Sequence, residues 1–135
     1  GMNVTKLVSS IEYAYTTDVS VIRVSPTKVK VSEHTNWTKI CTKPFPNLII
    51  SDKMEAKNKL WTAELDFFTN QSLPTHRRLV WKIGFSNGQF MLLGDGQRPY
   101  PIQQFTDKAP ENPTDNQLLE VKVTYSTPRI IPCII

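Results

Sequence analysis

The chain has 135 residues, of which 39% are hydrophobic and 21% are charged, with 10 prolines against 5 glycines. This composition suits one globular domain spanning 1–135 that is large enough to bury a core without disulfides. No apolar run approaches the roughly 20 residues that a membrane helix needs, so no membrane partner is expected. The formal net charge of +4 comes from scattered single lysines and arginines, which solvated strand faces explain without a polyanionic partner.

The first residues bear on where the protein is made. Gly1 is expected to be the remnant of a cleaved tag before an initiating methionine. The segment 3–15 lacks the basic region and the apolar stretch of a signal peptide, which predicts a cytoplasmic location.

Apolar and polar residues alternate with period two through most of the chain, and this pattern predicts strands. Seven short strands are expected, at 19–24, 28–32, 37–41, 48–51, 60–68, 78–85 and 118–126. The strand at 78–85 is expected to have a hairpin partner directly after it. The segment 52–58 has a competing interpretation. It is rich in helix formers, so it could make a turn or two of helix with Asp52 as the N-cap.

Asn87-Gly88 predicts a hairpin after 78–85, because this pair is preferred in two-residue type I′ turns. Such a turn would place Phe85 opposite Phe90 and Ile83 opposite Leu92. The apolar residues would then share one buried face on both strands.

The second half of the chain contains more loop and proline. Gly94-Asp95-Gly96 is expected to form a bend that ends the hairpin. The segment 97–105 is expected to be extended and 106–117 to be a polar loop. The tail 126–135 is apolar but interrupted by prolines, which predicts an edge segment lying across the sheet.

These elements predict a mainly β, single-domain protein, either a β-sandwich or a small β-barrel of about seven short, mostly antiparallel strands. At most one short helical turn is expected, near 52–58. The predicted core consists of Trp61, Leu65, Trp81, Ile83, Phe85, Phe90, Leu92, Val121, Val123 and Tyr125.

The glycine, histidine and cysteine residues give no cofactor or metal site. Gly94-Asp95-Gly96 follows a strand as phosphate loops do, but prolines follow it where such a loop needs a helix. His34 and His76 have no partner at metal-ligand spacing. Cys41 and Cys133 are expected to be reduced and partly buried, and the sequence leaves open whether they are close together.

Carboxylates are the remaining catalytic candidates. Glu64 and Asp66 share a strand face about 7 Å apart by strand rise, within the broad range of glycosidase pairs. Alternating acids on a solvated strand face are common, and no aromatic sugar platform accompanies these two. We therefore expect no enzyme and no small-molecule substrate.

A nucleic-acid-binding barrel would need exposed aromatic residues among basic ones. Most aromatics fall on the apolar face, but Arg98 is close to Tyr100, and Phe105 follows on an extended segment. His76, Arg77 and Arg78 form a small basic cluster. The candidate partner contacts are thus His76, Arg77, Arg78, Arg98, Tyr100 and Phe105.

Several stretches together carry a family resemblance: "IEYAYTTDVSVI", "LWTAELDF", "FSNGQFMLLGDGQRPYP" and "EVKVTYSTPRIIP". In this layout the chain resembles small uncharacterised proteins encoded among the structural genes of prophages and related elements in anaerobic gut bacteria. The resemblance implies a virion-associated or tail-associated assembly role, with no catalytic residues to carry over.

Taken together, the sequence predicts a non-enzymatic structural or assembly protein that acts through protein–protein contacts, with a protein partner or self-association. The alternative is a small β-barrel that binds nucleic acid. The proline-rich segments 98–105 and 127–135 are candidate contact sites, because they are apolar and need little ordering on binding.

Overall fold

The computed structural model describes residues 3–44, 46–108 and 118–135. They form one 3-10 turn, η1 (Thr16–Asp18), and eleven strands. The strands are β1 (Asn3–Tyr15), β2 (Val21–Ser25), β3 (Lys28–Val31), β4 (Thr38–Ile40), β5 (Asn47–Glu55), β6 (Asn58–Thr69), β7 (Leu79–Phe85), β8 (Phe90–Leu93), β9 (Ile102–Lys108), β10 (Leu118–Thr127) and β11 (Cys133–Ile134). The mainly β prediction is confirmed, with more strands than expected; β5, β6 and β10 are longer than predicted, whereas β2, β3, β4 and β7 are shorter. The described part of the chain contains no helix with the length and hydropathy of a membrane span.

The strands form one open sheet in the order β2-β3-β11-β8-β7-β1-β5-β6-β10-β9, with β4 paired beside β1. Every pair is antiparallel except β11 with β3. Because β2 and β9 do not pair with each other, the sheet does not close, and the barrel alternative is wrong. Both end strands therefore keep one edge without a strand partner among the described residues.

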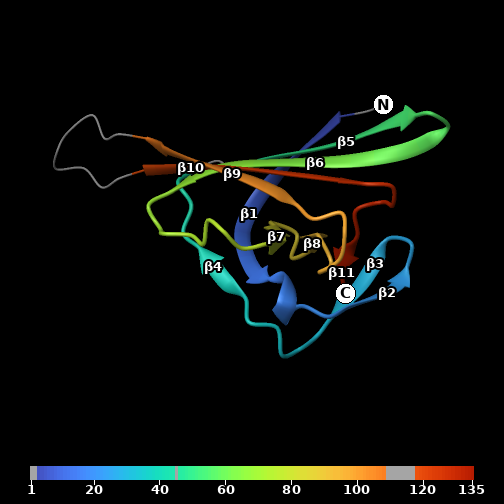
Figure 1. The fold of residues 1–135 in the computed structure, drawn as a ribbon, viewed down its shortest axis with the longest axis horizontal. Coiled ribbons are helices and arrows are strands. Elements are labelled where there is room, and N and C mark those ends of the chain that lie inside the picture. Colours follow the sequence, from blue (N-terminus) through green and yellow to red (C-terminus); the bar gives the residue numbers. More distant parts are fainter. Residues whose placement is uncertain (1–2, 45, 109–117) are drawn as a thin grey trace.

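The sheet folds over on itself through β1, the first strand (Figure 1). Residues 3–7 of β1 pair with β5, whereas residues 8–15 pair with β7. The register with β7 shifts between Val8 and Ser10, so Ser9 is an extra residue of the kind that bends a strand. We call β5, β6, β10 and β9 the β6 layer, and β2, β3, β11, β8, β7 and β4 the β7 layer; β1 belongs to both.

The main core lies between the two layers. The Phe67 ring of β6 meets the Trp81 ring of β7 edge to face, with centroids 6.0 Å apart. Trp81, Ile83 and Val121 are fully buried, and Leu65 and Val123 are nearly so. Trp61 and Phe85 are only partly buried, although both pack against this core. Phe90 is also partly buried and belongs to neither hydrophobic cluster, which corrects its placement in the predicted core. A second, smaller cluster of Val29, Val80 and Leu92 lies on the other face of β7 and β8.

The segment 52–58 forms no helical turn; it is the end of the β5–β6 hairpin. Glu55 pairs with Asn58, and the two residues between them, Ala56 and Lys57, both have positive φ. A two-residue turn with positive φ at both positions is type I′. Cross-strand pairing along the whole of β5 and β6 outweighs the helix-forming composition of this segment.

The β7–β8 hairpin exists, but its predicted register is wrong by one residue. Phe85 N–H donates to the Gln89 carbonyl and Gly88 N–H to the Phe85 carbonyl, so the loop has three residues. Only Gly88 in it has positive φ, at 84°, as in a type I turn with a bulge. Ile83 consequently pairs with Met91, and Leu92 points to the opposite face, into the second cluster.

The C-terminal tail is not an edge segment. After β10, residues 128–132 lead from the β6 layer to the β7 layer, where β11 lies between β3 and β8. Ile131 and Pro132 are buried on the way. The prolines are tolerated because they precede the strand, and the Pro132 carbonyl still accepts a hydrogen bond from Leu92 N–H at 3.0 Å. Most of the predicted 106–117 loop lies outside the described residues, and its first three residues belong to β9.

Candidate functional site

The basic residues predicted as contacts do gather around aromatic rings. The Arg78 guanidinium lies 4.3 Å from the centroid of the Tyr100 ring, and the Arg77 guanidinium lies 4.1 Å from that of Tyr15. Arg98 and Arg78 line one surface depression of about 810 Å³ together with Tyr100. Two segments separated by some 20 positions in the sequence thus meet at one place.

Backbone contacts fix both segments. Thr16 N–H donates to the Arg78 carbonyl at 3.1 Å, and the Gln103 side-chain amide donates to the Arg77 carbonyl at 2.9 Å. Gln97 N–H donates to Asp95 Oδ1 at 3.0 Å, which holds the turn before the prolines. Arg98 and Tyr100 therefore lie in a turn whose backbone is constrained by hydrogen bonds and by prolines.

This turn leads directly into β9, an end strand of the sheet. One side of β9 pairs with β10 from Ile102 to Lys108, and no other described strand pairs with its outer side. Ile102 is 67% exposed, and several other large apolar side chains on strands are exposed as well, among them Ile22 and Val24 of the other end strand, β2. An open edge with exposed apolar residues is a template for pairing with another chain.

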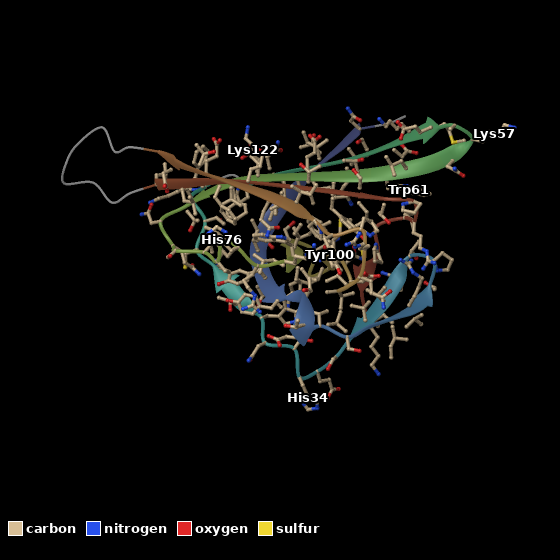
Figure 2. The ribbon with its side chains drawn as sticks, in the orientation of Figure 1. His34, Lys57, Trp61, His76, Tyr100 and Lys122 are labelled. Carbon is tan, nitrogen blue, oxygen red and sulfur yellow. The ribbon has the colours of Figure 1, made fainter. Side chains whose placement is uncertain are left out.

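The other two predicted contacts behave differently. His76 is exposed, in the loop that also carries Arg77 and Arg78 (Figure 2). Phe105 is partly buried and packs against the main core, so its side chain is not a free contact. It pairs with Val121, whose face of β10 is buried, and this partner could not be known from the sequence.

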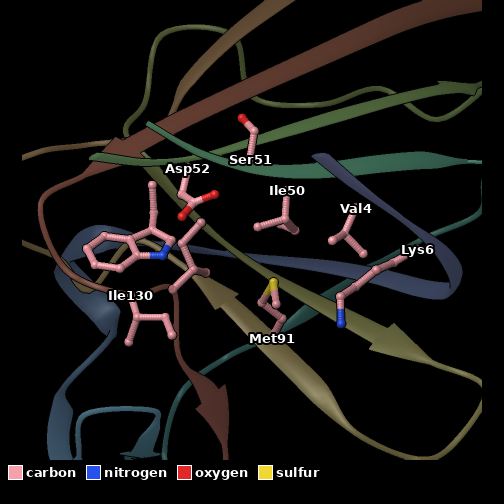
Figure 3. A pocket seen from close by; sticks show the side chains of 9 residues that line it. Val4, Lys6, Ile50, Ser51, Asp52, Met91 and Ile130 are labelled. Atoms are coloured by element: carbon pink, nitrogen blue, oxygen red, sulfur yellow. The ribbon is translucent and has the colours of Figure 1, made fainter. Parts of the chain in front are cut away.

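A second feature, which sequence reasoning missed, is an apolar cleft at the end of the molecule where the two layers separate. One part of about 670 Å³ is lined by Val4, Lys6, Ile50, Ser51, Asp52, Trp61, Met91, Ile130 and Ile131. In Figure 3, Lys6 lies at one end of this part and Ile130 at the other, with Ile50 and Met91 between them. A neighbouring part, also about 670 Å³, is lined by residues 23–27, Trp61, Arg129 and Ile130. Trp61 and Ile130 line both.

The residues considered for catalysis or metal binding lie outside this cleft. Glu64 and Asp66 line a smaller hollow of about 310 Å³ on the outer face of the β6 layer, from which Lys122 also projects (Figure 2). No group of metal-ligating side chains occurs in the described ranges. Cys41 and Cys133 are both free thiols, and Cys41 is exposed rather than partly buried as predicted.

Comparison of the chain with protein families, curated proteins and solved structures finds no match. The resemblance to prophage-encoded proteins therefore stays a prediction.

Proposed function

We propose that this protein is a non-enzymatic assembly protein that self-associates through the open edge of β9. The observation that carries the proposal is the outer side of β9, which pairs with no other described strand, together with its exposed Ile102. A second chain adding a strand there would satisfy the free backbone groups. The resemblance to prophage structural proteins suggests virion or tail assembly as the setting.

The sequence of β9 favours a second copy as the partner strand. If two β9 strands pair antiparallel about Phe105, Gln104 of each copy lies opposite Thr106 of the other, and Gln103 lies opposite Asp107. No like charges among these residues face each other. The equivalent pairing of β2 about Arg23 would oppose two arginines, which is unfavourable.

The register gives a charge-swap test, because Gln104 and Thr106 are both exposed. Substituting both with lysine places two Lys–Lys pairs in the interface, and we expect dimerisation to weaken about tenfold, since like charges opposite each other cost roughly 0.2–1 kcal/mol per pair. The matched control, Gln104→Glu with Thr106→Lys, creates two opposite-charge pairs and should dimerise at least as well as the wild type. Sedimentation equilibrium measures all three.

Two results would contradict the proposal. A wild-type chain that stays monomeric up to its solubility limit would remove self-association altogether. Equal dimerisation of the double-lysine and charge-swapped variants would show that the interface lies away from β9.

Nucleic-acid binding is the second candidate, favoured by the Arg78 guanidinium on Tyr100 with Arg98 in the same depression. Cationic groups beside an aromatic ring can contact phosphates and stack on bases. Titration with single-stranded DNA at two salt concentrations tests it: this function requires affinity that falls steeply with salt and is lost in Arg78→Gln/Arg98→Gln. Salt-independent or absent binding would leave the assembly proposal alone.

A further inference from the structure

The apolar cleft between the layers carries two arginines in one of its two parts. The part beside the β2–β3 turn is lined by the apolar residues Val24, Pro26, Trp61 and Ile130. The charged side chains that line it are Arg23 and Arg129. No acidic residue within 3–44, 46–108 or 118–135 lines this part. Among the described residues neither guanidinium forms an ion pair; Arg23 donates to the Pro26 carbonyl at 2.7 Å.

The neighbouring part of the cleft extends the apolar surface past Trp61 and Ile130. Its apolar residues are Val4, Ile50, Met91 and Ile131. The acidic group that lines it, Asp52, is bonded to Lys59 at 2.9 Å, so its charge is already compensated. Lys6 lies at the far end with its ammonium group 5.3 Å from the centroid of the Phe85 ring.

We propose that this cleft binds a single-chain amphiphile with a carboxylate head group. Arg23 and Arg129 would hold the carboxylate, because guanidinium groups match carboxylates in charge and in hydrogen-bonding geometry. The alkyl chain would lie against Trp61 and Ile130 and continue toward Ile50 and Met91. The volume of each part falls within the range of roughly 300–1,000 Å³ that small-molecule sites occupy.

The positive charge of the two arginines favours an amphiphile with an anionic head group over one with a cationic or neutral head group. A cationic amphiphile would place its head beside two arginines, which is repulsive. A neutral chain would gain no electrostatic attraction from the two guanidinium groups, which are exposed to solvent. The site is separate from the β9 edge and shares none of its residues. The proposal is therefore independent of self-association.

The test uses isothermal titration with dodecanoate below its micelle concentration, and dodecyltrimethylammonium as the ligand with the same tail and the opposite head. We expect dodecanoate to bind the wild-type chain at one site. The cationic ligand and the variant Arg129→Gln should each bind at least about tenfold more weakly, as the loss of a charge-assisted hydrogen bond predicts. Ile130→Glu, which puts a carboxylate at the junction of the two parts, should abolish dodecanoate binding.

The matched control is Arg98→Gln, which also removes an exposed arginine but lies in the depression beside β9. It should bind dodecanoate like the wild type, and thermal unfolding of each variant shows whether it is folded. The proposal is wrong if dodecanoate does not bind, or if the two head groups bind equally. It is also wrong if Arg129→Gln and Arg98→Gln weaken binding to the same extent.

Discussion

The buried phenol of Tyr125 makes the stability of the fold depend on pH. Its side chain is 6% exposed, and burial raises the pKa of its phenol above the ordinary value of 10.0. A hydrogen bond with Thr127 opposes this rise, as does the charge of Arg23, whereas Asp95 adds to it. The folded protein therefore prefers the neutral phenol.

The consequence is a loss of stability at alkaline pH. Because the folded pKa lies above the unfolded one, unfolding releases a proton once the pH exceeds about 10. The contribution of the neutral Tyr125 phenol to the free energy of unfolding is fully present below about pH 10, and it is lost as the pH rises through the pKa of the folded state. Urea unfolding from about pH 9 to about pH 11 should show a smaller decline for Tyr125→Phe than for the wild type. Parallel declines would contradict the assignment.

At the scale of elements, the β7–β8 hairpin explains why a correct turn prediction gave a wrong register. Asn-Gly suits both a two-residue type I′ turn and the glycine of a three-residue loop. Alternation would normally decide, because a one-residue slip exchanges the faces of a strand. Here Met91, Leu92 and Leu93 are all buried, since both faces of β8 are covered, so the sequence pattern carried no register information.

Gly88, in the β7–β8 loop, and Gly94, directly after β8, test how much the backbone conformation and side-chain crowding each contribute to stability. Gly88 and Gly94 both have positive φ, but a Cβ on Gly88 would meet nothing within 4 Å, whereas one on Gly94 would lie 3.0 Å from the Pro101 ring. Gly88→Ala should cost about 1 kcal/mol from the backbone alone, and Gly94→Ala roughly 2 kcal/mol or more because crowding is added. Urea unfolding measures both. Equal losses would show that the Pro101 contact is unimportant.

At the scale of the whole molecule, β1 makes the two layers one structure. It pairs with β5 in the β6 layer and with β7 in the β7 layer, and its Ile11 is fully buried in the core between them. Neither layer can bury its inner face without the other. We therefore expect the layers to unfold together.

Tryptophans report on each layer, since Trp61 lies in β6 and Trp81 in β7. Their ¹⁹F resonances in fluorotryptophan-labelled protein should disappear at the same urea concentration. Ile11→Ala should lower the free energy of unfolding by about 3 kcal/mol and move both transitions equally. Separate midpoints for Trp61 and Trp81 would mean that the layers are independent folding units.

The mainly β class, the inward face of β6 and the position of the β7–β8 turn could all be predicted from the sequence, because they follow from local alternation and turn chemistry. The sequence also identified Arg78, Arg98 and Tyr100 as contact candidates. Three features depend on contacts between distant segments and could not be predicted: Arg78 lies over the Tyr100 ring beside an end strand, Phe105 packs against the core, and β11 lies inside the sheet. The cleft could not be predicted from the sequence, because Trp61, Ile130 and the β2–β3 turn are distant from one another in the chain. Folding the sheet through β1 brings the two layers together, and no period in the sequence encodes such a long-range contact.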